Sequence, residues 1–162
     1  ELYPEYKANR PPVPKDFLKE CDQLFLELDS LGVSSCVVNG FEADDVLGTV
    51  SSKATESGFN VVIVTCDLDL LQLLTPKVTV EVFSQYWPTR TFNMESAKYR
   101  FHGIEPHQIA DFKALAGDRT DNLPGVKGIG ELSASELLKE KEDLESIYDD
   151  IIATHPGARR AP

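Results

Sequence analysis

The chain has 162 residues, a formal net charge of −11 and a hydrophobic content of 41%, values compatible with one globular domain that buries a core. It contains no apolar run near the ~20 residues of a membrane span and no signal-peptide pattern, so we expect no membrane partner. Taken alone, the acidic charge argues against nucleic acid. Bound Mg²⁺ ions would, however, return positive charge, and basic patches can exist locally.

The three cysteines, Cys21, Cys36 and Cys66, are odd in number and widely spaced. They match neither a zinc-ligand spacing nor a disulfide framework, so we expect a reducing, cytosol-like compartment. For Cys66, a packing role is expected rather than a nucleophilic one.

Residues 1–15 contain a proline-rich stretch at positions 11–14, which prevents a helix and predicts an extended connector. Lys7 and Arg10 lie close to Tyr6 in the sequence, and basic residues beside aromatic ones can hold nucleic acid. An exposed, proline-rich linker explains the same pattern more simply.

A helix is predicted over residues 16–31, capped by Asp16 and ended by Gly32. One of its faces is apolar at helical spacing and should pack on the core. This face carries Phe17, Cys21, Leu24, Phe25 and Leu28.

The next segments alternate between strand and helix. Residues 36–38 predict a short strand, residues 42–57 a helix, and residues 61–65 a second strand. The last of these, VVIVT, is nearly continuous apolar sequence, typical of a parallel strand covered on both faces. The order favours right-handed βαβ units and an α/β fold. The helix should face the core with Ala43, Leu47, Val50 and Ala54.

Five acids lie next to these elements: Glu42, Asp44 and Asp45 at the helix start, and Asp67 and Asp69 directly after the second strand. In open α/β sheets, sites lie outside the carboxyl ends of the strands, so the two groups can converge there. Like charges that close repel and raise pKa values. Mg²⁺ or Mn²⁺ would relieve the repulsion. The alternative is that the first group favours a helix N-terminus and that an Asp caps the next helix.

Beyond residue 69 we expect a short helix at 70–74, a strand at 78–83 and a hairpin partner at 89–92. Helices should follow at 94–101, capped by Asn93, at 106–116, and at 144–152, capped by Asp143. The tail at 153–162 is expected to be disordered.

The stretch 117–130, GDRTDNLPGVKGIG, predicts a tight glycine hairpin between two helices, the second at 131–139. Glycine lets the backbone turn sharply and approach a ligand, and amides at the second helix's N-terminus can bind a phosphate. Lys127 adds charge at the tip, and Asp118 and Asp121 lie just before it. A plain turn between two helices, with a glycine at the end of the first, remains the alternative.

Four motifs together resemble the 5′-nuclease family, which holds the flap endonucleases and the 5′→3′ exonuclease domain of bacterial DNA polymerase I. They are PEYKANRPPVP at 4–14, EADDV at 42–46, TCDLDLLQLL at 65–74 and GDRTDNLPGVKGIG at 117–130. The resemblance extends over residues 1–152. It implies an α/β, PIN-like nuclease fold with a parallel central sheet flanked by helices and a C-terminal helix-hairpin-helix subdomain. Residues 1–15 would end the helical arch, 16–116 form the nuclease core, and 117–152 form the subdomain.

The resemblance also implies roles for particular residues. Glu42 and Asp44 match ligands of a first divalent metal, and Asp67, Asp69 and Asp121 match ligands of a second. Asp45 and Asp118 match further or outer-sphere ligands. Basic residues that reach the scissile phosphate correspond to Lys7 and Arg10, beside Tyr6. Duplex backbone, with a bound K⁺, would lie at Gly125, Val126, Lys127, Gly128, Ile129 and Gly130.

The sequence departs from the family pattern at Leu68, where the family often has Lys, and at Leu132 and Ser133, where it often has Lys and Thr. Two family acids would precede Glu1, so we expect the 162-residue chain by itself to be inactive or severely impaired. The expected activity of the parent protein is structure-specific 5′→3′ exonuclease and flap cleavage with two Mg²⁺ or Mn²⁺ ions.

Two alternatives to that activity stay open: a non-catalytic DNA-binding fragment and a related metal-dependent RNase. A polymerase domain in the same chain is a possible partner. The protein would be cytoplasmic in a bacterium or organellar in a eukaryote.

Overall fold

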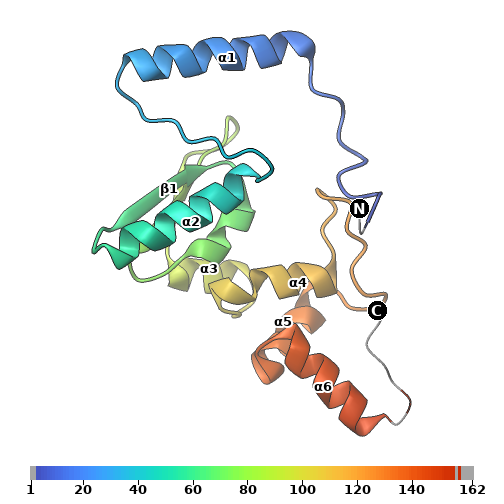
Figure 1. Cartoon of the computed structure of the whole chain (residues 1–162). Coiled ribbons are helices and arrows are strands. Elements are labelled where there is room, and N and C mark those ends of the chain that lie inside the picture. Colours follow the sequence, from blue (N-terminus) through green and yellow to red (C-terminus); the bar gives the residue numbers. More distant parts are fainter. Residues whose placement is uncertain (1–2, 156, 158–162) are drawn as a thin grey trace.

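The computed structural model describes residues 3–155 and 157 of the chain; residues 1–2, 156 and 158–162 are not described. The predicted disordered tail therefore lies largely outside the described residues. In chain order (Figure 1), the elements are α1 (Lys15–Ser30), α2 (Ala43–Glu56), β1 (Val61–Thr65), η1 (Leu68–Leu73), β2 (Val78–Val82), β3 (Arg90–Phe92), α3 (Met94–Arg100), η2 (Pro106–Gln108), α4 (Ile109–Ala116), α5 (Glu131–Lys141) and α6 (Leu144–Thr154).

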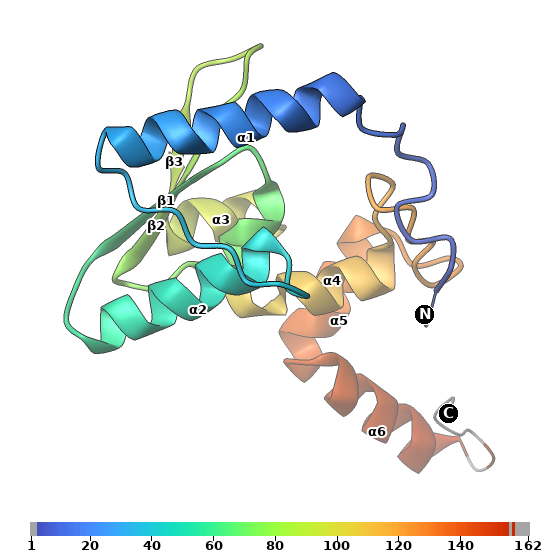
Figure 2. The same cartoon turned by 45° about the horizontal axis from the view of Figure 1, so that its top comes forward.

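The sheet has the order β1-β2-β3. β1 and β2 are parallel, with Val61 opposite Val78, and β3 returns antiparallel to β2. The α/β class is thus confirmed, and the predicted hairpin partner at 89–92 forms β3. The helices α4, α5 and α6 lie together beyond the sheet (Figures 1 and 2).

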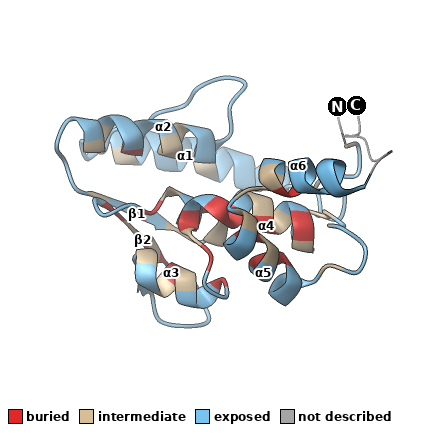
Figure 3. Ribbon diagram, turned by 90° about the horizontal axis from the view of Figure 1, so that it is seen from below, coloured by how far each residue is buried: buried red, intermediate tan, exposed pale blue. Residues whose placement is uncertain are grey.

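One apolar core joins the sheet to these C-terminal helices. Leu71 and Val80 are fully buried in it, as is Leu138 of α5, and burial of each such side chain contributes about 1.5–3 kcal/mol. Figure 3 shows buried residues concentrated in α4 and α5 and around the sheet, whereas α1 and α2 are mostly exposed. The core therefore holds η1 and α4, which carry site residues, in fixed relation to each other.

The first helix forms almost as predicted, but its packing does not. None of its residues is buried, and Leu24 and Phe25 are about half exposed. The helix begins one residue early, at Lys15, so Pro14 occupies the cap position and the prediction that Asp16 caps it was wrong. An amphipathic pattern predicts that a helix has an apolar face, but it does not name what covers that face. Among the described residues, nothing buries it.

The strand predicted at residues 36–38 is absent, and this part of the described chain is irregular. Val37 is 78% exposed. A strand forms by pairing with a neighbour, and β1 pairs only with β2 within the described residues. The βαβ unit expected across residues 36–65 is therefore absent. So is the expected burial of β1 on both faces, because Val62 and Val64 are exposed while Ile63 is buried.

Smaller differences follow from local geometry. Leu47 of α2 packs against the core, but Val50, expected to face it too, is exposed. The short helix after β1 is a 3₁₀ helix that starts at Leu68 rather than residue 70, because Asp67 caps it. The predicted helix at 106–116 begins as the 3₁₀ turn η2 and continues as α4. No helix in the described part of the chain is both long enough and apolar enough to span a membrane.

Candidate metal and nucleic-acid site

Three of the predicted metal ligands meet in one cluster. Asp69 lies in the first turn of η1, and Asp118 and Asp121 lie in the loop after α4. One carboxylate oxygen from each comes within 4.8 Å of the others, and all three side chains are half-buried. Oxygen ligands from separate elements at this spacing suit a hard divalent cation.

Lys113 of α4 lies against this cluster and pairs with both Asp69 and Asp118. Burial raises the pKa of Asp69 despite the Lys113 ammonium. Asp118 is half-buried too, and this burial would raise its pKa, but Lys113 and the Thr120 amide lower its pKa below the ordinary range. The ammonium thus already neutralises part of the charge that a metal ion would neutralise.

Sequence reasoning placed Lys113 only on the helix at 106–116 and assigned it no role. Ile109, four residues earlier on the same face, is buried, and so is the adjacent Phe112. The sequence signal for a role of Lys113 at the site was therefore a charged residue on an otherwise apolar helix face. The same pattern also fits a side chain whose charged end reaches solvent, so it did not identify Lys113 as a site residue.

The other acids gather at the start of α2 and the start of η1. Burial first, and then the nearby charges of Asp67 and Glu42, raise the pKa of Asp44. Asp44 is thus within electrostatic reach of Asp67, as expected if the two groups share the carboxyl edge of the sheet. No cluster of mutually close ligand atoms that includes Glu42, Asp44, Asp45 or Asp67 occurs among the described residues.

Two of these acids also have the capping contacts considered as the alternative. An Asp67 carboxylate oxygen accepts the Asp69 amide at 2.9 Å, and an Asp45 oxygen accepts the Glu42 amide at 3.0 Å. Such contacts fix the backbone of each acidic turn. They leave other carboxylate oxygens for a ligand, so capping and metal binding are compatible.

The N-terminal segment is docked on the loop that carries Asp118 and Asp121. The Lys7 amide donates to the Asp121 carbonyl at 3.0 Å, and the Asn122 side chain donates to the Glu5 carbonyl at 2.7 Å. Asn9 donates to the Arg119 carbonyl at 3.0 Å. Residues 3–10 are therefore attached to the site rather than forming a free linker.

This docking brings the predicted phosphate-contacting residues to the acids. Arg10 pairs with Asp121 at 2.5 Å, and Lys7 pairs with Glu42 at 3.1 Å. The Tyr6 hydroxyl donates to Asp121 at 3.2 Å, and the Lys7 ammonium lies 4.7 Å from the centre of the Tyr6 ring. Lys7 thereby links the segment to α2, and Arg10 links it to the three-aspartate cluster.

The acid cleft is the open cavity around this cluster, with a volume of about 1280 Å³. It is lined by Asp67, Asp69, Asp118 and Asp121 together with Arg10, Lys113 and Arg119, and it extends to Gly130 and Glu131 at the start of α5. A long anionic ligand at the acids could thus continue toward the glycine hairpin.

The hairpin at 125–130 stands between α4 and α5. Gly117 and Gly125, both at positive φ, pack so closely that a Cβ on Gly125 would lie 2.4 Å from the Gly117 nitrogen. By contrast, a Cβ on Gly128 or Gly130 would meet no atom of the described residues within 4 Å. Val126 and Lys127 are exposed, while Ile129 packs against the core. The first pair of glycines builds the turn, and the second pair leaves its outer surface open.

Comparison with known families covers nearly the whole chain. Residues 1–102 match the 5′-3′ exonuclease N-terminal resolvase-like domain, and residues 104–161 match the 5′-3′ exonuclease C-terminal SAM fold. The chain therefore belongs to the 5′-3′ exonuclease family, a family of hydrolases that act on DNA. The expected resemblance is confirmed, whereas the expected domain boundaries and the roles of individual residues stay predictions.

The relatives are much longer proteins. DNA polymerase I of Chloroflexus aurantiacus is 38% identical over 156 residues, which are 94% of this chain and 17% of that protein. The thermostable DNA polymerase I of Thermus aquaticus is 41% identical over 159 residues, 98% of this chain and 18% of the relative. The chain thus spans less than a fifth of the length of these relatives.

Solved structures confirm the PIN-like nuclease fold. T5 5′-exonuclease with bound divalent metal ions (zinc) matches with a TM-score of 0.71 and 26% identity, over 96% of this chain and 59% of that one. The catalytic core of Rad2 in complex with DNA substrate matches with a TM-score of 0.56 and 20% identity, over 91% and 46%. At the latter identity the likeness concerns the fold alone.

Proposed function

We propose that the protein containing this chain is a structure-specific 5′→3′ exonuclease and flap endonuclease that hydrolyses DNA phosphodiesters with Mg²⁺ or Mn²⁺. The observation that carries the proposal is the convergence of Asp69, Asp118 and Asp121, with oxygens within 4.8 Å of one another, beside the cations Lys113 and Arg10. Carboxylates that would otherwise repel each other are the donor set for hard divalent ions.

The acids divide between two ion positions as the family resemblance implies. Glu42 and Asp44 would hold one ion, Asp67, Asp69 and Asp121 a second, and Asp45 and Asp118 would support them. Divalent ions bound there would supply a water of lowered pKa and neutralise charge on the leaving oxygen.

The chain's own cations would position the substrate. Lys7 and Arg10 reach Glu42 and Asp121, so a phosphate located between these acids lies within reach of both side chains. An arginine guanidinium can hold two phosphate oxygens at once, which would orient the phosphodiester, and Tyr6 would support Lys7 from the same segment. Lys113 would keep Asp69 and Asp118 ionised as the substrate's own negative charge approaches.

Duplex backbone would lie at the glycine hairpin, with a K⁺ ion at the same place. The open surface at Gly128 and Gly130 supports this proposal, because phosphates can approach amides that no side chain covers. Contacts to backbone position DNA without reading its sequence. The substrate would therefore be chosen by its shape, such as a 5′ end or a 5′ flap.

The relatives named DNA polymerase I support a further proposal, that a polymerase domain lies in the same polypeptide. The three widely spaced cysteines are the ground for a second proposal, that the protein works in a reducing compartment, cytoplasmic in a bacterium or organellar in a eukaryote. Sequencing the complete gene tests the first, and fractionating the source cells tests the second.

The activity is tested with the full-length protein and a 5′-flap duplex that carries a label on the flap. Mn²⁺ should give cleavage near the flap junction, EDTA should abolish it, and Asp121→Asn should lower the rate by about a hundredfold or more, as for other lost transition-state contacts. Asp22→Asn on α1 is the control with the same charge change. Cleavage that persists in EDTA, or that Asp121→Asn leaves unchanged, contradicts the proposal. Equal cleavage of an RNA flap would favour the RNase alternative.

A further inference from the structure

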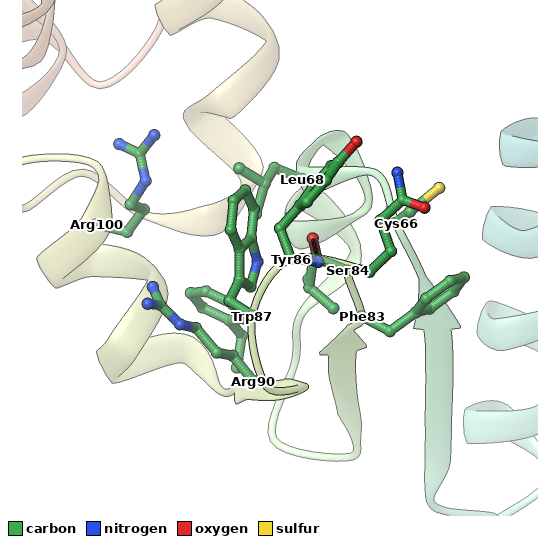
Figure 4. A pocket seen from close by; sticks show the side chains of 11 residues that line it. Cys66, Leu68, Phe83, Ser84, Tyr86, Trp87, Arg90 and Arg100 are labelled. Atoms are coloured by element: carbon green, nitrogen blue, oxygen red, sulfur yellow. Dashed lines mark hydrogen bonds between the residues drawn. The ribbon is translucent and has the colours of Figure 1, made fainter.

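A second cavity, with a volume of about 460 Å³, lies beside the acid cleft. It is formed where β1 and β2 end, between the loop from β2 to β3 and the end of α3, and we call it the loop cavity (Figure 4). Its size falls in the range of sites for small molecules. None of its lining residues was assigned a function above.

The loop cavity presents aromatic rings to solvent. Tyr86 and Trp87 are 78% and 53% exposed, and their ring centres lie 6.1 Å apart with an angle of 48° between the planes. Phe83 and Phe92 also line the cavity. A cluster of exposed rings around a hollow is typical of a binding surface.

The charge of the loop cavity opposes that of the rest of the molecule. Arg90 and Arg100 line it, and no Asp or Glu among the described residues does, although the chain as a whole carries −11. Neither arginine has an ion pair with another described residue, and the Arg100 guanidinium lies 5.3 Å from the centre of the Phe101 ring. Figure 4 shows Tyr86 and Trp87 beside Leu68, with the two arginines on the side away from Cys66.

Exposed rings with adjacent guanidinium groups fit a nucleotide whose base is unpaired. A base stacks on an aromatic face while arginines contact its phosphates, and this combination is typical of single-strand binding. A duplex keeps its base faces inside the stack, so it cannot use the rings in this way. Charge complementarity favours a phosphodiester chain over an apolar peptide.

The loop cavity is also continuous with the acid cleft. Cys66, Leu68 and Arg100 line both, and Leu68 lies between Asp67 and Asp69 in the sequence. A strand with one phosphate at the acids can therefore place a neighbouring nucleotide in the cavity. Leu68 stands where the 5′-nuclease family often has Lys, and its apolar side chain lines the connection between the loop cavity and the acid cleft.

We propose that the loop cavity binds an unpaired nucleotide of the DNA strand whose phosphodiester lies in the acid cleft. The base stacks on Trp87 and Tyr86, and Arg90 and Arg100 contact the adjacent phosphates. The proposal rests on the proposed nuclease function, because that function places the strand in the acid cleft.

Trp87 is the only tryptophan of the chain, so its fluorescence reports directly on stacking. The chain is titrated in EDTA with oligothymidylate of about ten nucleotides, within the usual site size of single-strand binders, and separately with a blunt duplex. The single strand should quench Trp87 saturably, and the duplex should not. A labelled oligonucleotide that binds, by anisotropy, without changing Trp87 fluorescence overturns the proposal.

Variants identify the contacts. Trp87→Ala should weaken binding of the labelled oligonucleotide about fivefold to 150-fold, the range for one lost stacked base. The double variant Arg90→Gln, Arg100→Gln should reduce the slope of log affinity against log salt by about 1.4, because each of the two lost phosphate contacts on a single strand contributes about 0.7. Tyr99→Ala, an exposed ring on α3, and Lys53→Gln on α2 should bind like the parent. Unchanged affinity in folded Trp87→Ala overturns the proposal.

The titration distinguishes failure of the cavity from failure of the nuclease proposal, because it needs neither metal nor cleavage. Flap cleavage by the full-length protein together with an unresponsive Trp87 rejects the loop cavity and keeps the nuclease function. Saturable quenching together with no metal-dependent cleavage supports single-strand binding and rejects the nuclease function.

Discussion

At the scale of single residues, Lys113 balances the three-aspartate cluster. It pairs with Asp69 and Asp118, and its side chain is 22% exposed, so solvent screens these pairs only in part. Without metal, the ammonium offsets repulsion between carboxylates. With metal, the ammonium and the ion compete for the same oxygens.

Replacing Lys113 with Met should therefore change stability in two opposite ways. The metal-free protein should melt a few degrees lower, because the acids lose their counter-ion, at about 2–4 °C per kcal/mol for a chain of this size. Stabilisation by Mn²⁺ should increase, because the ion no longer competes with the ammonium. Thermal melts in EDTA and in Mn²⁺ measure both effects.

The matched control is Lys98→Met, which removes the surface pair between Lys98 and Glu105, two residues that do not line the acid cleft. It should leave the Mn²⁺ response unchanged. If Lys113→Met melts and responds to Mn²⁺ like the control, Lys113 does not balance the cluster.

Asp44 gives the protein a pH dependence of known sign. Its pKa is raised in the fold by burial, then by Asp67 and Glu42. A carboxyl with a raised folded pKa contributes stability that is complete below its unfolded pKa of about 3.9 and is lost as pH rises through the folded value. Asp44→Asn should remove that loss.

In EDTA, the melting temperature of Asp44→Asn should therefore rise relative to the parent as pH increases from about 3.5 to 6, a window around the unfolded pKa. Asp22→Asn on α1 serves as the control for charge. Parallel curves for parent and Asp44→Asn across this window would show that Asp44 has no unfavourable charge environment.

At this scale, the sequence predicted contacts between residues close together in the chain better than contacts between residues far apart in it. The caps Asn93 and Asp143 are confirmed, because each needs only an amide three residues ahead. The two partners of Lys113 are separated from it by 44 and 5 positions, and no local pattern encodes the first of these. The attachment of Asn9 and Asn122 to opposite segments was missed for the same reason.

At the scale of elements, two glycines of the hairpin are expected to have different roles, one in folding and one in binding. Gly125 has φ 66°, and its Cβ position is blocked by the Gly117 backbone, so Gly125→Ala should destabilise the fold. Gly130 has φ −100° and open space, so Gly130→Val should fold normally. If phosphates approach the hairpin, that valine should nevertheless weaken duplex binding.

The measurement is the affinity for a labelled blunt duplex in EDTA, together with a melt of each variant. Ser52→Val, which adds a valine on the exposed face of α2, is the control for the substitution. Gly130→Val that melts and binds like the parent removes the hairpin from the binding surface.

Elements with local signals were predicted well, and elements that depend on neighbours were not. Capping residues and apolar periodicity fixed α2, α3 and α6 to within a few residues. The prediction of a strand at 36–38 was wrong, because three apolar residues form a strand only where they can pair with a neighbouring strand. The apolar face of α1 was real, but its burial depended on a partner that no residue of α1 specifies.

At the scale of the whole molecule, the net charge of −11 is unevenly distributed over the surface. Part of it gathers in the acid cleft, while the loop cavity and the N-terminal segment carry cations. The overall charge therefore does not describe the surface that the proposed DNA substrate would contact. For that reason the sequence motifs predicted the family better than the net charge did. The motif spacing predicted the family and fold, and the geometry added Lys113, the docked segment and the loop cavity.

A metal ion that binds only the folded chain should raise its melting temperature. The stabilisation is RT ln(1 + [L]/Kd), about 2.7 kcal/mol at a hundredfold excess of Mn²⁺ over Kd, which corresponds to about 5–10 °C here. Salt also screens an acidic protein, so NaCl at matched ionic strength provides the baseline. Asp69→Asn with Asp118→Asn should lose most of the Mn²⁺ effect, since it removes two of the three clustered carboxylates. Asp22→Asn with Asp29→Asn makes the same change in net charge on α1 and should keep the effect. Equal shifts in Mn²⁺ and NaCl, or equal responses of the two double variants, would mean that charge alone governs stability and that the acids hold no ion.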